Sequence, residues 1–362
     1  MKGFQKLEQN ALCRWLALIK CPRFGFVPLL KLQQTLPDPT QIFSLKKSEW
    51  HYFGLQAEQI KNLANTDWTY IDALSEYLFE NDISFIPYAH SYYPELLLNS
   101  ARPPIGLFVK GNLELLHSAQ IAFVGSRSPS HYGKQVTQQL IQELATCKVT
   151  ITSGLAIGID GAAHQSALKH QCPTIAVMGS GFKHIYPKRH QQLACEIAQD
   201  GLLISEFLPD VPPVQNNFPR RNRIIAGLCN GVVVVEAAVK SGSLITAQYA
   251  LEEGRDVFAV PGNIFNPISA GCHHLIQQGA KLITSAADIV EDYLILPVKQ
   301  QVTKNHLAGS QLLASVDHDT TPVDVIVQRS NLPVDQVLME LLDLEVQGAI
   351  TAVPGGYVKV AT

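Results

Sequence analysis

Apolar residues recur along the first 82 residues at helical spacing, in short stretches separated by proline and glycine. The stretches are 11–20, 28–35, 58–65 and 69–79. This pattern predicts an all-α domain over residues 1–82. Residues 83–117 begin rich in proline and tyrosine, and we expect them to form a connector that packs on the following domain.

From residue 118 to 296 the pattern changes, because short β-branched runs alternate with amphipathic segments. The runs are 119–124, 149–153, 174–178, 202–206, 231–236, 256–260 and 280–283. The intervening helical segments include 133–145, 158–170, 189–200 and 243–254. Strands this uniformly apolar are buried on both faces, which predicts a Rossmann-like α/β fold with a parallel sheet flanked by helices. The loops that follow the strands would then share one edge of the sheet.

A polar linker over residues 297–310 precedes a small C-terminal module over residues 311–362. Two helical stretches, 323–330 and 334–348, are followed by a hairpin sequence with Pro354-Gly355-Gly356 at its tip. This order predicts a winged-helix domain. The module is acidic, and a winged helix that grips duplex DNA needs a basic face. We therefore expect this module to contact another protein or to have a regulatory role.

Bulk composition restricts the possible functions. The net charge of −3 gives no general attraction to nucleic acid, so any DNA binding must arise from local arrangement. Apolar runs fall short of the roughly 18 residues that span a bilayer, and the N-terminus lacks the pattern of a signal peptide. The seven cysteines are scattered without a CxxC pair, which indicates reduced thiols in a cytoplasm.

Glycine-containing loops follow most of the expected strands. They contain Gly125-Ser126-Arg127, Gly154, Gly179-Ser180-Gly181, Ser241-Gly242-Ser243 and Pro261-Gly262. Glycine lets backbone N–H groups approach an anion, and a helix N-terminus adds partial positive charge. One such loop suits a nucleotide, whereas several along one edge better match a polynucleotide backbone. Any single loop is equally well explained as a tight turn.

Basic and aromatic residues occur at the same predicted edge. The bases are Arg127, Lys183, Lys188, Arg189, Arg220, Arg221, Arg223 and Lys240, and the interleaved aromatic residues are Phe182, Tyr186 and Phe218. Between residues 118 and 290 basic and acidic residues are almost equally numerous, so a basic patch would come from placement. Modest charge with stacking rings suits single strands better than duplex. The bases could also form a solvated face, and the aromatic rings could belong to the core.

Enzymatic alternatives have weaker support. Gly179 and Gly181 begin a dinucleotide-binding GxGxxG pattern and Glu206 stands where a ribose-binding acid would, but His184 replaces the third glycine. The P-loop pattern is absent. In a lysine decarboxylase-like hydrolase a glycine-rich loop supplies a catalytic acid; here Glu236 precedes the loop and no acid follows at the needed spacing. We find no catalytic set and predict no enzyme activity.

Metal sites are also poorly supported. Asp160 and His164 are spaced like half a metal site, but without a third ligand we expect capping and packing roles. Cys272-His273-His274 lacks metal-ligand spacing. His273 and Ile276 share one helix face near the run 280–283, which favours a subunit contact. We therefore expect neither a metal nor a cofactor.

Taken together, six segments resemble the DprA/Smf family of DNA-processing proteins. The segments are 124–133, 153–168, 179–187, 218–228, 236–262 and 271–283, with signatures such as VGSRSPSHYG, FPRRNRIIAGL and GCHHLIQQGAKLI. They occur in order across most of the predicted α/β domain. The helical N-terminal region looks like the sterile-alpha-motif-like (SAM-like) domain of that family, and the C-terminal module looks like its winged-helix domain.

The resemblance implies a cytoplasmic bacterial protein that binds incoming single-stranded DNA during natural transformation, protects the strand and loads the RecA recombinase onto it. It also implies a homodimer through the Rossmann-like domain, with His273, Ile276 and Leu282 as interface candidates. With the basic residue that precedes the Ser-Gly-Ser loop included, the candidate DNA-binding residues are Gly125, Ser126, Arg127, Lys183, Phe218, Arg221, Asn222, Arg223, Lys240, Ser241, Gly242 and Ser243.

Overall fold

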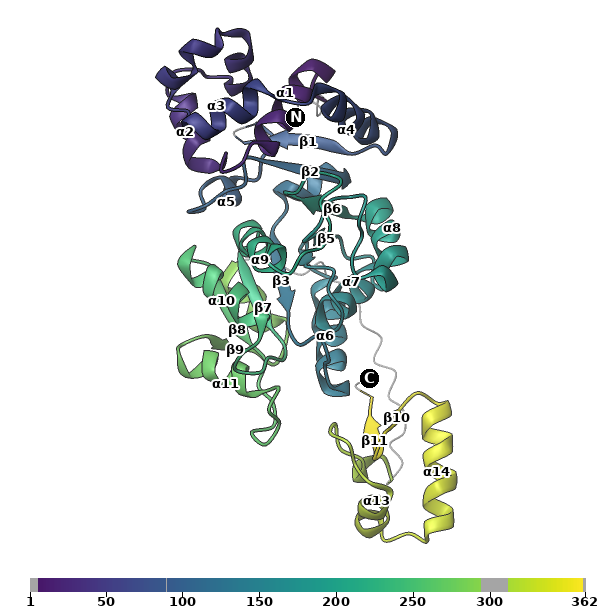
Figure 1. The fold of residues 1–362 in the computed structure, drawn as a ribbon. Coiled ribbons are helices and arrows are strands. Elements are labelled where there is room, and N and C mark those ends of the chain that lie inside the picture. Colours follow the sequence, from purple (N-terminus) through teal and green to yellow (C-terminus); the bar gives the residue numbers. More distant parts are fainter. Residues whose placement is uncertain (1–5, 89, 294–311, 361–362) are drawn as a thin grey trace.

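The computed structural model describes residues 6–88, 90–293 and 312–360. Three regions follow one another along its length: N-terminal helices at one end, a large sheet in the middle and a small helix–hairpin module at the other end (Figure 1).

The N-terminal region is helical up to Glu80. Its helices are α1 (Gln9–Lys20), α2 (Phe26–Gln33), α3 (Ala57–Ala64) and α4 (Trp68–Glu80), with 3₁₀ turns at Pro39–Ser44 and Lys47–Phe53. The side chain of Asp67 accepts a hydrogen bond from Tyr70 N and so caps α4. Leu16, Leu18 and Leu74 are among the fully or almost fully buried residues of the shared core.

The central sheet contains nine strands in the order β1-β2-β6-β5-β4-β3-β7-β8-β9. The strands are β1 (Ser84–Pro87), β2 (Gly106–Gly111), β3 (Gln120–Val124), β4 (Thr150–Ser153), β5 (Thr174–Val177), β6 (Leu202–Ser205), β7 (Gly231–Val234), β8 (Asp256–Ala259) and β9 (Lys281–Leu282). From β6 to β9 all neighbours pair in parallel, as the apolar runs predict. The predicted parallel α/β sheet is therefore confirmed.

The segment 83–117 contributes two strands that its sequence pattern did not single out. β1 pairs antiparallel with β2, and β2 pairs antiparallel with β6, so both extend the sheet beyond its parallel part. Between and after them lie α5 (Glu95–Leu98) and a 3₁₀ turn at Leu113–His117. Short strands of this kind depend on a distant partner, here β6, more than on local sequence.

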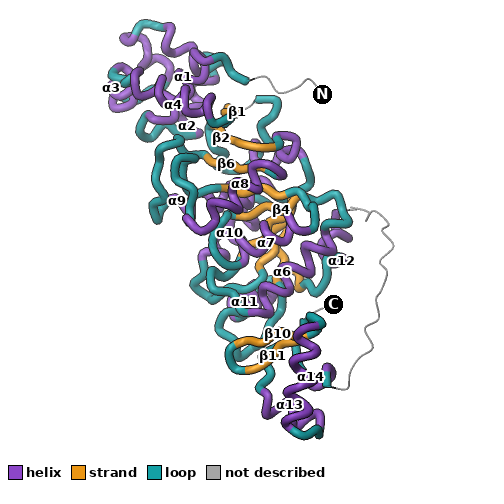
Figure 2. The backbone as a smooth tube through the Cα atoms, turned by 90° about the vertical axis from the view of Figure 1, so that its right-hand side faces the viewer, coloured by secondary structure: helices purple, strands orange, loops and turns teal. Residues whose placement is uncertain are grey.

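Helices cover both faces of the sheet (Figure 2). They are α6 (His131–Leu144), α7 (Ile159–Lys169), α8 (Gln191–Asp200), α9 (Asn217–Leu228), α10 (Gly242–Glu252), α11 (Ala270–Gln277) and α12 (Ala287–Val290). Along β3, Ile121 and Phe123 belong to the core that includes residues of α6 and α7, whereas Ala122 and Val124 belong to the core that includes residues of α9 and α10. This alternation is the period-two pattern of a strand buried on both sides.

The N-terminal helices share a hydrophobic core with one end of the sheet. Phe85 of β1 and Phe108 of β2 join the cluster of buried N-terminal side chains, with ring centroids 5.0 Å apart. Tyr70 Oη donates a hydrogen bond to Asp210 Oδ2 over 2.7 Å, which ties α4 to the loop after β6. The two regions are therefore joined by packing as well as by sequence.

The C-terminal module has the helix–helix–hairpin order of a winged helix. It consists of α13 (Val323–Ser330), α14 (Val334–Val346), β10 (Ile350–Val353) and β11 (Gly356–Lys359), which pair antiparallel. Asn331 ends α13 in the left-handed conformation, with φ at 56°. The module has its own small core, around Ile326 and Leu341. The predicted linker over 297–310 lies outside the described residues.

Candidate functional site

β3 and β7 are parallel neighbours, and the chain runs outward from them toward opposite edges of the sheet. This switch point leaves a crevice at the carboxyl ends of β3 and β7. From β3 the chain proceeds through β4, β5 and β6 on one side and returns to β7, β8 and β9 on the other. Ligands of doubly wound sheets bind outside the strand ends at such a switch point. A cavity of about 780 Å³ lies there, and we call it the crevice. The sequence candidates that line it are Gly125, Ser126, Arg127, Phe218, Arg221, Asn222, Ser241, Gly242 and Ser243.

The loop after β3 is held against the start of α7. A Cβ on Gly125 would lie 2.6 Å from the side chain of Ile159, so glycine is required by close packing. Ser126 O accepts a hydrogen bond from Ile159 N over 3.1 Å, and Gly158 has a φ of +87° where it meets this loop. The backbone at Gly125–Arg127 is thus fixed, while the side chain of Arg127 is exposed to solvent.

Helix α9 brings three of the candidates to the crevice: Phe218, Arg221 and Asn222. Only 3% of Arg221 is exposed, and Nη1 donates hydrogen bonds to the carbonyl oxygens of Gly154 and Val177. Arg221 therefore connects the ends of β4 and β5 from beneath the crevice. Its burial lowers the pKa of Arg221 to about 10, and the carboxylate of Asp160 opposes this shift.

The start of α10 forms the opposite wall. Ser241 caps the helix by accepting a hydrogen bond from Ser243 N over 3.3 Å. Asn222 Nδ2 donates to Gly242 O over 3.3 Å and so joins this wall to α9. Hydroxyl groups and the start of a helix thus face the crevice, and both favour an anionic ligand.

Two aromatic rings lie at the mouth of the crevice. The ring centroids of Tyr186 and Phe218 are 5.5 Å apart, and Tyr186 is 49% exposed. The guanidinium carbon of Arg127 lies 5.7 Å from the centre of the Phe218 ring. A cation and two aromatic side chains are therefore available together, which is the combination that binds an unpaired base and its phosphate.

Three sequence candidates lie outside the crevice lining. Lys183 Nζ lies 4.5 Å from the centre of the Tyr77 ring, on the N-terminal helices. Arg223 donates hydrogen bonds to Glu206 Oε2 and to Arg102 O. Lys240 is exposed in the loop before Ser241. Glu206, the candidate for binding a ribose, is taken up by its ion pair with Arg223.

Asp160 is a buried acid that sequence reasoning did not place in the crevice. It lines the floor, where Oδ2 accepts hydrogen bonds from the backbone N of Gly154 and Ala156. Burial raises the pKa of Asp160, and the nearby Arg221 opposes that rise. His164, one turn later, bonds through Nδ1 to Thr174 Oγ1 over 2.8 Å. Among the described residues no cluster of three potential metal ligands occurs.

The remaining glycine loops are filled by the protein itself. A Cβ on Gly179 would lie 2.8 Å from the ring of Phe218, and one on Gly154 would lie 2.5 Å from the guanidinium of Arg221. Gly181 packs on the carbonyl oxygens of Leu208 and Pro209. These glycines therefore permit close packing that positions Phe218 and Arg221, whereas the loops at Gly125 and Ser241 face the crevice.

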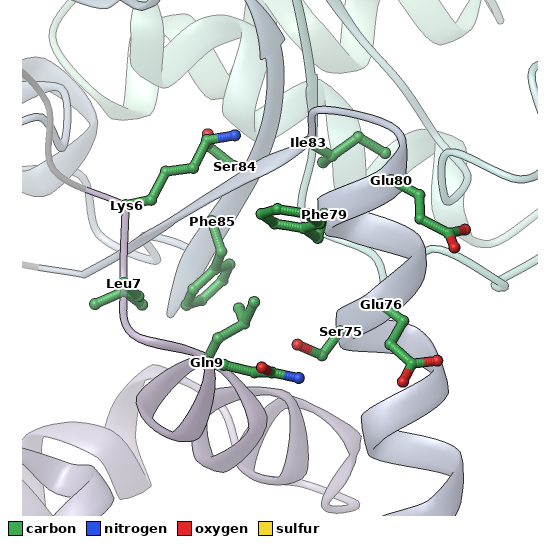
Figure 3. A pocket seen from close by; sticks show the side chains of 11 residues that line it. Lys6, Leu7, Gln9, Ser75, Glu76, Phe79, Glu80, Ile83, Ser84 and Phe85 are labelled. Atoms are coloured by element: carbon green, nitrogen blue, oxygen red, sulfur yellow. The ribbon is translucent and has the colours of Figure 1, made fainter.

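A second cavity, of about 420 Å³, has a different character (Figure 3). It lies between α1, α4 and β1, where the aromatic side chains of Phe79 and Phe85 line it. The basic residue there, Lys6, is paired with Asp82 over 2.6 Å. An apolar lining with a neutralised cation does not suit an anionic ligand, so the crevice remains the candidate site.

Comparison with known protein families gives two matches. The family described as DNA recombination-mediator protein A matches residues 84–294, which span the sheet and the crevice. The family described as DprA winged helix domain matches residues 308–356. Protein Smf of Escherichia coli (strain K12) is 46% identical over 321 residues, covering 84% of this chain and 85% of that protein. The chain belongs to the DprA/Smf family.

Other family members and their structures agree with this assignment. DNA processing protein DprA of Streptococcus pneumoniae (strain R6) is 50% identical over 201 residues, covering 56% of this chain and 71% of that protein. An X-ray structure of DprA from S. pneumoniae superimposes with a TM-score of 0.70 and 39% identity, over 80% of this chain and 99% of that chain. The predictions of the family, the α/β sheet and the C-terminal winged helix are therefore confirmed.

A further structure of a DprA/Smf protein is also similar to the present chain. It is DNA processing protein A from Helicobacter pylori, described for its single-stranded DNA binding mode. The match has a TM-score of 0.53 and 30% identity and covers 59% of this chain and 95% of that chain. The region in common includes more than half of the present chain.

The three candidate interface residues lie at the far edge of the sheet. His273 and Ile276 are on α11, and Leu282, which is 47% exposed, is on the edge strand β9. His273 Nε2 lies 3.0 Å from Gly262 O. Among the described helices none is long and apolar enough to cross a membrane.

Proposed function

We propose that this DprA-family protein binds single-stranded DNA in the crevice, with little preference for base sequence. The observation that carries the proposal is the position of Arg127. Its side chain is exposed beside the rigid Gly125–Arg127 backbone, with the ring of Phe218 at 5.7 Å. In the proposed mode Arg127 contacts a phosphate and Phe218, backed by Tyr186, stacks on a base.

The remaining crevice residues support this mode in different ways. Ser241 and Ser243 offer hydroxyl groups and Gly242 lines the crevice at the start of α10, while the N–H groups of the two serines donate to Ala238 O and Ser241 Oγ. Asn222 is positioned by its hydrogen bond to Gly242 O. Arg221 acts through its charge and by holding the floor, because Nη1 donates to two carbonyl oxygens and Nε donates to Asn222 Oδ1. Lys183 and Lys240 extend the positive field around the crevice without lining it, whereas the charge of Arg223 is offset by its ion pair with Glu206.

We infer that the activity is non-catalytic. Among the described crevice residues the one carboxylate, Asp160, is held by two backbone N–H groups. The hydroxyls of Ser241 and Ser243 lie 2.6 Å from each other, and no histidine lines the crevice beside them. A nucleophile paired with a general base, as acyl or phosphoryl transfer needs, does not face the ligand there.

The wider role we propose is that of a cytoplasmic protein that protects incoming single strands and loads the RecA recombinase during natural transformation. A homodimer would form at the sheet edge, at His273, Ile276 and Leu282. Ile264 and Phe265, in the loop between β8 and α11, are also exposed. A short edge strand with the exposed side chain of Leu282 favours association with a second copy.

The winged helix is proposed to contact protein. Helix α14 leaves Leu338, Met339 and Leu342 exposed, at 48%, 68% and 61%. From residue 309 onward the chain carries seven acidic residues and two basic ones. Exposed apolar side chains on an acidic helix suit a protein partner better than the phosphates of DNA.

The experiment that tests the crevice separates its two contacts. Arg127→Gln is expected to weaken binding of fluorescent oligo-dT by about 10-fold or more and to reduce the slope of log affinity against log salt by about 0.7. Phe218→Leu is expected to weaken binding by about 10-fold with an unchanged salt slope, since it removes stacking alone.

The matched control is Lys169→Gln, which removes an exposed charge at the far end of α7. It is expected to leave affinity and slope almost unchanged. Equal losses in Lys169→Gln and Arg127→Gln would mean that general charge, not the crevice, holds the strand. Unchanged binding in Arg127→Gln would refute the proposed site.

A further inference from the structure

A third cavity, distinct from the one in Figure 3, adjoins the crevice on the side of α6 and α7. It has a volume of about 470 Å³ and is lined by residues 127–129, by Lys134 and Gln138 of α6, by the start of α7, and by Arg189 and His190. We call it the basin. Arg127 lines both the basin and the crevice, so the two cavities are neighbours that share one cation.

The charge of the basin is one-sided. Arg127, Lys134 and Arg189 are all exposed there, and no aspartate or glutamate lines it. Some other cations of the described chain stand within 4.0 Å of a carboxylate, as in the pairs Lys6–Asp82 and Lys281–Glu291. None of the three basin cations has such a pair among the described residues. Like charges gathered around one cavity repel each other, and a bound anion offsets that cost.

His190 adds a buried polar group to the basin wall. Only 9% of it is exposed, and Nδ1 donates to Leu155 O over 2.9 Å, which fixes the ring. Nε2 has no hydrogen-bond partner among the described residues and lies where a Cβ on Gly161 would approach to 3.0 Å. His190 thus contributes a fixed polar ring to the basin wall.

The backbone of the basin points to the same ligand class. Gly158, Gly161 and Ala162 line it at the first turn of α7. Two N–H groups there already have acceptors, since Ile159 N donates to Ser126 O and Ala162 N donates to Gly158 O, so the helix start acts mainly through its partial positive charge. Asp160 does not cap this turn, because its carboxylate accepts from Gly154 N and Ala156 N. The partial positive charge of the helix start adds to that of the three cations and is offset in part by the carboxylate of Asp160 in the same turn.

We propose that the basin is a second phosphate subsite, which takes the backbone of the same single strand where it leaves the crevice past Arg127. The proposal rests on the function proposed for the crevice and extends it. No phenylalanine, tyrosine or tryptophan lines the basin, so a base has no ring there to stack on. The basin would hold the phosphodiester backbone alone, with Lys134 and Arg189 as the contacts beyond Arg127.

The test compares a double variant with a matched double variant. Lys134→Gln/Arg189→Gln removes two basin cations, whereas Lys148→Gln/Lys169→Gln removes two exposed cations outside the basin. Oligo-dT strands of about 15 and about 5 nucleotides bracket the usual size of such sites. The basin variant should bind the long strand about 10-fold more weakly, with a salt slope smaller by about 1.4, and the short strand almost normally.

Two results would overturn the proposal. One is a long-strand affinity and slope in the basin variant that match those of the Lys148→Gln/Lys169→Gln control. The other is an equal loss for both strand lengths, because the short strand fits the crevice alone.

Failure of the basin is distinguishable from failure of the crevice. If Arg127→Gln weakens both lengths and the basin variant weakens neither, the crevice stands and the basin claim is wrong. If Arg127→Gln leaves both lengths unchanged, the crevice proposal itself fails, and the basin proposal falls with it.

Discussion

Arg127 and Arg221 both belong to the crevice, but their guanidinium groups have different surroundings. Arg127 is exposed and lies over the ring of Phe218, and its charge opposes the rise in the pKa of the buried Asp160. Arg221 is buried, and its Nη1 already donates to two carbonyl oxygens. The first arginine is therefore available to a ligand, while the second stabilises the ends of the strands that form the floor.

This difference gives a prediction about stability. Arg221→Ala should lower the free energy of unfolding by about 3 kcal/mol, because it leaves two buried carbonyl oxygens unpaired and opens a cavity. Arg221→Lys should cost less, since it keeps the charge but loses the fork of donors. Urea unfolding followed by circular dichroism measures both. The exposed Lys169→Ala should change stability by less than about 0.5 kcal/mol, and a similarly small effect of Arg221→Ala would contradict the assigned role.

His164 predicts a dependence of stability on pH. Its burial, aided by the charges of His190 and Arg221, lowers the pKa of His164 to about 3. An unfolded histidine has a pKa of about 6.5, so below that pH the unfolded chain takes up a proton that the folded protein excludes. The neutral, buried His164 therefore lowers the free energy of unfolding by nothing above about pH 6.5 and by an increasing amount as the pH falls toward 3.

The size of this effect can be measured by difference. Between pH 7.5 and pH 5.5, His164 should cost the folded protein about 1.4 kcal/mol. In His164→Gln the fall in unfolding free energy over that interval should be smaller by this amount. Other titrating groups remain in both proteins and cancel in the comparison. An identical pH dependence in the two would show that His164 is not excluded from protonation.

At the scale of elements, α9 does most to build the crevice. Its first two turns carry Phe218, Arg221 and Asn222, and no acidic residue occurs in its first turn. Cations at a helix N-terminus are unfavourable unless an anion or a fixed acceptor is near. Here Arg221 donates to carbonyl oxygens and Arg223 pairs with Glu206. Arg127, in the loop after β3, therefore remains available to contact the ligand.

The predicted dimer contact lies on α11 and β9. Leu282→Glu, on the edge strand, should convert a dimer to a monomer, because two like charges would face each other across a two-fold contact. Ile276→Glu should act in the same direction. Light scattering after size-exclusion chromatography measures the mass, with the exposed Gln277→Glu as control. A monomeric wild type, or a dimer unaffected by both variants, would contradict the interface.

The sequence predicts elements well where local pattern decides them. β3 and β7 are nearly continuous apolar runs with both faces buried, so their local sequences alone predict them as strands. β1 and β2 could not, because their pairing depends on β6, which is far away in the sequence. The period-two and helical patterns carry no information on such distant antiparallel additions.

The crevice could be predicted only in part. The loops at Gly125 and Ser241 follow strands, so their meeting at one edge follows from topology. The direction of Lys183 could not be foreseen, since it depends on how α4 places Tyr77. Arg221 also gave no local signal of burial, because the carbonyl oxygens that hold it come from two other strands.

At the scale of the whole molecule, the positive charge at the proposed site comes from the placement of basic residues and not from an excess of them. The chain as a whole has a net charge of −3, yet the crevice and the basin share Arg127 and together include Lys134 and Arg189. The acidic winged helix has a separate small core. Binding should therefore depend on a local field and stacking, which favours a flexible single strand over a duplex that buries its bases.

The most direct test is the affinity of the full chain for oligo-dT and for a matched duplex at two salt concentrations. We predict tighter binding of the single strand at both, and an affinity that falls as salt rises because phosphate contacts release counterions. Equal or tighter binding of the duplex, or a single-strand affinity that is independent of salt, would contradict the assignment of the crevice to single-stranded DNA.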